Sequence, residues 1–245
     1  MHQRHLRHIE RHRAQVNAQF ERQLRHINRA FDRQRERAER ILSGRQEEII
    51  QAGLQLLNEE GINELSLLKL AKKLNLQASA LYWHFKSKED LVDYIAEAIL
   101  SKEFAEIAPR RADESWQDWL IALIKRLRNA MLAYRDGGRI VAGAHLYPAV
   151  TLIRLLEAGA EALTSAGLSE SRAELIMSTA THFTFGRVIE EQSGPTTEEV
   201  KNLNLKELAK QFPHAAKGMQ RFKNVKNITE MTNHQFEESL RLIIQ

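Results

Sequence analysis

Apolar residues recur every three or four positions along almost the whole of this chain, which is the spacing of one face of an α-helix. Glycine and proline, which most often interrupt helices, number only 11 and 4 among the 245 residues. No stretch shows the alternation of apolar and polar residues that is typical of a half-buried strand. The sequence therefore predicts an all-α fold.

Breaks in this periodicity divide the chain into three parts, which are residues 1–44, 45–100 and 101–245. The first part reads as one amphipathic helix that ends near Ser43 and Gly44. The second contains short helices at Arg45–Glu60, Leu67–Leu74 and Ala78–His84, followed by a longer one at Glu89–Phe104. Ser66 and Ser87 are well placed as N-caps. Two short helices joined by a tight turn have the geometry of a helix-turn-helix motif.

The third part is helical in period throughout. A turn is expected at Asp136-Gly137-Gly138, and a break at Ser193-Gly194-Pro195. The expected helices are Glu114–Tyr134, Pro148–Ala166, Ser169–Gln192, Thr197–Gln211 and Ile228–Ile243. Such a series predicts a helical bundle.

Positive charge is concentrated at the N-terminal end of the chain. Residues 1–44 contain 11 arginines, no lysine and 5 acidic residues, whereas the whole chain has a net charge of +4. This asymmetry indicates attraction to a polyanion, with nucleic acid the first candidate and an anionic membrane surface the second. The apolar stripe of the same helix also allows it to pack on the chain or to pair with a second copy. Both roles are left open.

Several classes of site are disfavoured by the sequence. The chain has no cysteine, which excludes disulfides and thiol chemistry and favours the cytoplasm. No apolar run is long enough to span a membrane, so no membrane insertion is expected. Four histidines share one face of the first helix with spacing that could ligate a metal, although a solvated stripe is the preferred interpretation: His2, His5, His8 and His12. No catalytic constellation or cofactor motif is visible, so we expect neither an enzyme nor a cofactor.

The segment 65–91 carries the most specific pattern. Leu70, Leu81 and Phe85 are spaced to anchor two short helices on one core, which leaves small, polar and ring-bearing side chains directed outward. Small residues allow the backbone to approach a DNA groove, and lysines nearby can contact phosphates. The candidate DNA-binding residues are Ser66, Lys69, Gln77, Ala78, Ser79, Ala80, Tyr82, His84, Lys86 and Lys88.

The block Leu81-Tyr82-Trp83-His84-Phe85-Lys86, followed by Lys88 and Leu91, closely resembles the signature of the TetR/AcrR family of bacterial regulators. Further blocks in the same order extend the resemblance over about residues 45–192. They begin at Glu114, Tyr134 and His182. The resemblance implies a homodimer with an N-terminal helix-turn-helix DNA-binding domain and a C-terminal ligand-binding and dimerisation bundle. The helices Ser169–Gln192 and Ile228–Gln245 would then form the intersubunit four-helix bundle. A small molecule in the core would shift the linking helix Glu89–Phe104 and release double-stranded operator DNA.

Two departures from the family pattern concern DNA readout. Leu67-Leu68 stands where many members have Thr or Met followed by a guanine-reading Arg. Ala78 stands where the tetracycline repressor has a base-reading Gln. An alternative function is therefore a helical dimeric interaction protein with weakened or retargeted DNA binding.

The same resemblance locates a candidate effector site. Of the six positions that contact drug and magnesium in the tetracycline repressor, only Glu190 is kept in kind, and apolar residues occupy four others, including Ala144. The effector is therefore expected to be a largely apolar small molecule other than tetracycline. The candidate lining comprises Phe104, Leu123, Leu127, Val141, His145, His182, Phe183 and Glu190.

Overall fold

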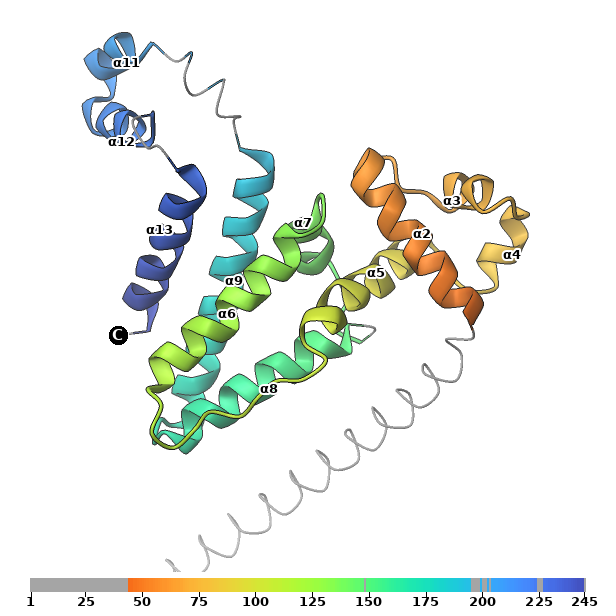
Figure 1. The fold of residues 1–245 in the computed structure, drawn as a ribbon, viewed down its shortest axis with the longest axis horizontal. Helices are drawn as coiled ribbons and strands as arrows, with labels where there is room; N and C mark the ends of the chain where they lie inside the picture. Colours follow the sequence, from red (N-terminus) through yellow and green to blue (C-terminus); the bar gives the residue numbers. More distant parts are fainter. Residues whose placement is uncertain are drawn as a thin grey trace, which may run out of the picture. The chain divides into compact units, whose positions relative to one another are not determined.

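A computed structural model describes residues 44–147, 149–194, 199, 202, 204–223 and 227–244. Every regular element within these residues is a helix, which confirms the all-α prediction. The predictions for the first helix, including the proposed histidine stripe, lie outside the described residues. The contacts reported below all lie within residues 50–244, and Figure 1 shows the course of the helices.

Three short helices open the described chain. They are α2 (Gly44–Glu60), α3 (Leu67–Lys73) and α4 (Ala78–Tyr82). Helix α2 ends where Gly61 adopts a φ of +87°, which lets its N–H donate to the Leu57 carbonyl at 2.8 Å. Asn75, with a φ of 53°, makes the tight turn between α3 and α4. These boundaries match the predicted helices to within two residues.

Side-chain caps fix where α3 and α5 (Lys88–Glu103) begin. The Ser66 hydroxyl accepts a hydrogen bond from the Lys69 N–H, and the Ser87 hydroxyl accepts one from the Asp90 N–H, each at 3.2 Å. Each bond satisfies an N–H that has no partner within its own helix. Both caps were predicted from the sequence.

The remaining large helices are α6 (Trp116–Leu132), α8 (Val150–Ser165), α9 (Glu170–Ser193) and α13 (Ile228–Ile243). Helix α9 contacts α6, α8 and α13, and α5 contacts α6 and α8 (Figure 1). The fully buried large side chains of this part include Phe104, Ile124, Leu127, Leu155 and Phe236. Burial of these side chains drives the assembly of the helices.

A short helix, α7 (Gly137–Ala142), follows the predicted turn and was missed because it has only six residues. Asp136 precedes it with a φ of 56°, which makes the expected chain reversal. Gly138 lies against α9 so closely that an added Cβ would be 2.8 Å from Val188 Cγ1. The paired glycines therefore serve close helix packing.

The C-terminal part differs from prediction in one further way. Helix α11 (Leu205–Gln211) is followed by a second short helix, α12 (Pro213–Lys223), and the two pack against each other. Proline is well tolerated in the first turn of a helix, so Pro213 starts α12 where the sequence had suggested only a break. Helix α13 begins and ends at the predicted residues.

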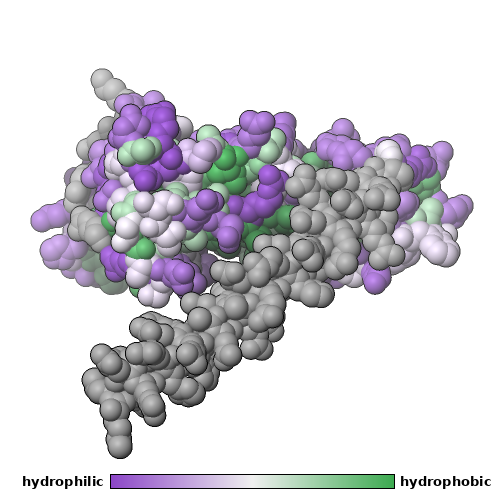
Figure 2. Space-filling view, turned by 90° about the horizontal axis from the view of Figure 1, so that it is seen from below, coloured by the Kyte–Doolittle hydropathy of each residue, from purple (hydrophilic) through white to green (hydrophobic). Residues whose placement is uncertain are grey.

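No helix among the described residues is both long enough and apolar enough to cross a membrane. The face of the described residues drawn in Figure 2 is largely hydrophilic, with smaller apolar areas between the polar ones.

Candidate nucleic-acid interface and effector core

Helices α3 and α4 are held by a small set of completely buried side chains. Leu70 on α3, Leu81 on α4 and Phe85 just after it have no exposed surface. The Phe85 ring also contacts Tyr94 of α5 edge to face, with ring centroids 5.5 Å apart. Because α4 has only five residues, this anchoring by Leu81 and Phe85 holds its other side chains in a fixed direction.

The candidate DNA-binding residues divide into two groups by exposure. Gln77, Ser79, Tyr82 and Lys86 are exposed, as expected for side chains that reach a partner. The other six are half-buried, namely Ser66, Lys69, Ala78, Ala80, His84 and Lys88. Both groups lie on α3, on α4 or next to these helices.

Two exposed apolar side chains of this region were not among the candidates. Trp83 is 89% exposed and Leu68 is 67% exposed. Trp83 lies inside the block that carried the family resemblance, and its neighbour Tyr82 was singled out, so the sequence did contain a signal for it. Leu68 follows Leu67, which is buried, and two adjacent helical residues cannot face the same core.

Two of the candidate lysines are engaged within the chain. The Lys69 ammonium donates to the carboxylates of Glu60 at 2.6 Å and Glu64 at 2.5 Å. These hydrogen bonds raise the pKa of Lys69, and the bond from Lys69 lowers the pKa of Glu64. Lys88 donates to the Ile62 carbonyl at 2.8 Å and so ties α5 to the loop after α2.

The same loop is joined to the chain around α7 by backbone hydrogen bonds. The Ile62 N–H donates to Asp136 Oδ2 at 2.9 Å, and the Arg135 N–H donates to Asn58 Oδ1 at 2.9 Å. The Arg135 guanidinium donates in turn to the Glu59 carbonyl at 2.9 Å. The end of α2 is therefore linked to the start of α7.

Two carboxylates one turn apart on α5 hold the segment that connects α7 and α8. Asp93 accepts a hydrogen bond from the His145 N–H at 2.9 Å, and its other oxygen lies 3.0 Å from His145 Nδ1. Glu97 accepts bonds from the Thr151 N–H at 2.9 Å and hydroxyl at 2.7 Å. Ala149, at the N-cap of α8, has no side chain that could cap the helix, so Glu97 caps α8 from another helix. Burial raises the pKa of Glu97. We call these four residues, Asp93, Glu97, His145 and Thr151, the α5 clasp.

A buried ion pair joins three helices of the core. The Arg128 guanidinium on α6 lies 2.8 Å from Glu191 on α9 and donates to Asn233 of α13 at 2.7 Å. Glu191 also accepts a bond from Arg187 Nε at 2.7 Å. Burial of an ion pair is tolerated when each charge has such partners.

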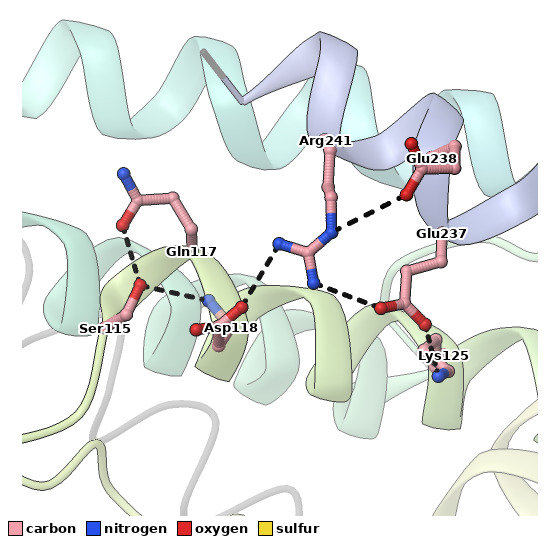
Figure 3. A network of polar contacts seen from close by, with 7 residues as sticks. All are labelled: Ser115, Gln117, Asp118, Lys125, Glu237, Glu238 and Arg241. Atoms are coloured by element: carbon pink, nitrogen blue, oxygen red, sulfur yellow. Dashed lines mark hydrogen bonds and ion pairs between the residues drawn. The ribbon is translucent and has the colours of Figure 1, made fainter. Parts of the chain in front are cut away.

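Two hollows lie on the surface of residues 50–244. One, of about 330 Å³, lies at the junction of α2 and α7 and is lined by Glu60, Gly61, Asn63, Arg135, Asp136, Arg139 and Gln192. The other, of about 390 Å³, lies between α6 and α13 beside the network in Figure 3, in which Arg241 joins Asp118 and Glu237. Lys125 extends this network to Glu237 at 2.7 Å.

The candidate effector residues are split between the core and the surface. Phe104, Leu123, Leu127 and Val141 are buried, and the Arg126 guanidinium lies 4.8 Å from the centre of the Phe104 ring. Phe183 is half-buried and stacks on Phe236 of α13, with ring centroids 5.5 Å apart. His145, His182 and Glu190 are exposed in the single chain. The structure thus brings the apolar candidates into one core and leaves these polar candidates on its surface.

Metal-ligating side chains do not cluster in the described part of the chain: no group of three or more His, Asp or Glu residues there is arranged to hold a metal ion.

Comparison with known proteins identifies the family. Residues 49–95 match the family model described as bacterial regulatory proteins, tetR family, and residues 108–245 match the tetracyclin repressor-like C-terminal domain. The chain belongs to the TetR family of transcriptional regulators. The two matches meet α5 from either side, which makes α5 the helix that joins the two conserved domains. The resemblance predicted from the sequence is confirmed.

Individual relatives agree with this assignment. The class A tetracycline repressor from transposon 1721 of Escherichia coli is 42% identical over 146 residues, which are 60% of this chain and 66%, just under two thirds, of that repressor. The crystal structure of a possible TetR family transcriptional regulator from Streptomyces coelicolor A3(2) is 30% identical, with a TM-score of 0.70 over 81% of this chain and 96% of that one. A TetR variant from Acinetobacter baumannii AYE in complex with minocycline is 28% identical, with a TM-score of 0.57 over 79% of this chain and 92% of that one.

Proposed function

We propose that this TetR family member is a cytoplasmic, homodimeric repressor that binds operator DNA through α3 and α4 and is released by a small molecule bound in the core. The observation that carries the proposal is the exposed face of α4. Gln77, Ser79 and Tyr82 are exposed there, while Leu81 and Phe85 fix the helix from behind. A short helix that presents such groups on a rigid support is suited to the major groove of DNA.

The α5 clasp supports a route by which the effector could act. Helix α5 carries the carboxylates that hold His145 and cap α8, and its other end is tied by Lys88 to the loop that precedes α3. A displacement of α5 relative to α8 would therefore be passed to the DNA-binding helices. In thermodynamic terms, the effector must bind more tightly to the displaced arrangement than to the DNA-binding one.

The proposed effector is a largely apolar molecule rather than a tetracycline–magnesium complex. Magnesium requires oxygen ligands in near-octahedral geometry. Phe104, Leu123 and Val141 supply no such ligand and are buried among apolar side chains. A molecule that enters this core would have to displace apolar contacts, which an apolar ligand can replace.

Paired substitutions on two exposed surfaces test the DNA-binding role. The variant Gln77→Ala/Tyr82→Ala removes the two larger polar side chains of α4. The matched control is Gln211→Ala/Phe212→Ala, in which an exposed glutamine and an aromatic residue, 56% exposed against 52% for Tyr82, are removed from α11 and its C-cap. Loss of about 1–3 kcal/mol of operator affinity at each contacted base pair is expected for the first variant only. Equal affinities of the two variants would refute this use of α4.

A second candidate function is a helical dimeric interaction protein with weakened DNA binding. The observation in its favour is the engagement of Lys69 and Lys88 by oxygen atoms of the same chain, together with Leu68 at an exposed position of α3. Under this alternative, the unsubstituted chain binds operator and random DNA equally at every salt concentration.

A further inference from the structure

The helix-turn-helix region of this chain has the wrong sign of charge for a DNA-binding surface. Residues 44–100 contain six basic and nine acidic side chains, which is a net charge of −3. Most of the affinity of a protein for DNA comes from the neutralisation of phosphates by lysine and arginine. A region that carries net negative charge therefore repels the duplex at long range.

Contacts within the region reduce its positive charge further. Lys69 donates to Glu60 and Glu64, and Lys73 donates to Glu59 at 2.6 Å. A phosphate that replaced these carboxylates would leave them nearby as uncompensated negative charges. Lys72 and Lys86 are the two further exposed lysines of the motif. A pair of lysines supplies little of the charge that a DNA-binding surface needs.

The sequence that immediately precedes α2 has the opposite composition. Residues 1–43 contain 11 arginines, no lysine and 5 acidic residues, a net charge of +6 before any histidine is protonated. Arginine remains charged at every physiological pH, and its planar guanidinium can donate two parallel hydrogen bonds to one phosphate. This choice of arginine over lysine favours phosphate binding over mere solubility.

We propose that the arginine-rich segment 1–43 binds the phosphate backbone of DNA and supplies most of the electrostatic affinity that the helix-turn-helix region lacks. This inference rests on the proposed function, because it assigns a second contact to the same complex. DNA is favoured over an anionic membrane because the segment directly precedes the helix-turn-helix region in sequence, and because the charge deficit lies in that region. With the segment included, residues 1–100 carry a net charge of +3.

This division of labour has two separable consequences. Each arginine–phosphate contact contributes about 0.9 to the slope of log affinity against log salt concentration. Phosphate contacts carry no direct sequence information, whereas base contacts from α4 do. Loss of arginines from the segment should therefore lower the affinity and the salt slope, but should leave the preference for operator over random DNA intact.

Three full-length variants with equal changes in net charge test the proposal. The first is Arg4→Gln/Arg7→Gln/Arg11→Gln/Arg13→Gln, and the second is Arg29→Gln/Arg33→Gln/Arg37→Gln/Arg40→Gln. The control changes four exposed residues of the C-terminal part, Arg111→Gln/Lys206→Gln/Lys210→Gln/Lys217→Gln. Fluorescence anisotropy gives the affinity for operator and random duplexes between low and moderate salt. Circular dichroism and thermal unfolding check that each variant is folded.

The proposal expects the salt slope of at least one segment variant to fall by up to about 3.6, while the control retains the original slope. Unchanged slopes in both segment variants, with operator preference intact in all proteins, would overturn the proposal and leave the proposed function standing. Absence of operator preference in the unsubstituted protein would instead overturn the proposed function. If the segment variants lose binding to phosphatidylglycerol vesicles and keep the original DNA slope, the segment is a membrane-binding element and the proposal is wrong.

Discussion

The helix-turn-helix region and helix α9 are stabilised in opposite ways. Helix α4 has five residues and buries only Leu81, and helix α3 begins at a cap supplied by the adjacent Ser66. Helix α9 has 24 residues, and its polar side chains reach distant parts of the chain, as when Gln192 donates to the Tyr134 carbonyl at 2.7 Å. Local interactions position the exposed face of α4, whereas long-range interactions hold α9 in the core.

The difference teaches where each region can change. A short helix fixed by a few buried residues keeps the rest of its surface available for contact with a partner. A long helix tied to several others transmits any displacement to them, because packed cores do not deform continuously. These properties suit the reading of DNA and the response to an effector respectively.

The largest expected effect separates the anchor of α4 from its exposed surface. Phe85→Ala removes a completely buried ring and should lower the free energy of unfolding by about 3–5 kcal/mol. Trp83→Ala removes a side chain that is 89% exposed and should change it by less than about 0.5 kcal/mol. Urea unfolding followed by circular dichroism measures both. Similar losses for the two variants would show that Trp83 is not a surface residue.

A comparable test addresses the long-range contacts of α9. Arg128→Ala leaves Glu191 and Asn233 buried without this partner, and should cost about 3 kcal/mol. The value lies at the lower end of the range for broken buried pairs because Arg187 still contacts Glu191. Arg241→Ala, which breaks the more exposed ion pair with Asp118 in Figure 3, should cost about 1 kcal/mol or less. The same unfolding experiment decides, and equal costs would contradict the role of the buried pair.

The α5 clasp predicts a pH-dependent effect. Glu97→Gln removes one acceptor of the α8 cap and should cost about 1–2 kcal/mol at pH 4. Because burial raises the pKa of Glu97 in the folded chain, ionisation costs stability as pH rises above the ordinary value of 4.5. The stability advantage of the unsubstituted chain over Glu97→Gln should therefore shrink between pH 4 and pH 7. Urea unfolding across this range measures the difference, and a growing advantage would reverse the assigned shift.

The smallest expected effect concerns the local cap of α3. Ser66→Ala removes the acceptor for the Lys69 N–H and should lower stability by about 1 kcal/mol. Ser79→Ala, at an exposed position within α4, serves as the control and should change stability by less than about 0.5 kcal/mol. Thermal unfolding compares the two. A loss at Ser79 equal to that at Ser66 would argue against the cap.

Local signals explain why much of the fold was predictable. Ser66 and Ser87 mark helix starts, Gly61 marks a helix end, and the periodic leucines identify the buried faces of α3 and α6. The family block around Tyr82 located the exposed face of α4 for the same reason, since all its determinants lie within a few residues. The positions of α7 and α12 escaped prediction because helices this short carry too few periodic residues.

Long-range contacts explain what the sequence could not reveal. Nothing near Thr151 in the sequence indicates that Glu97, 54 residues earlier, caps α8. Likewise, the lysines of the motif were expected to face phosphates, and their pairing with Glu60, Glu64 and the Ile62 carbonyl depends on how the helices fold together. The lining of an effector site is of this kind, and the candidate residues stay a prediction.

The central claim is that this chain recognises a specific DNA sequence, and one measurement tests it most directly. A duplex selected by the full-length protein from random-sequence DNA is compared with a scrambled duplex of equal length at the same salt concentration. The account predicts at least about a thousandfold tighter binding to the selected duplex. Equal affinity for the two duplexes would contradict it.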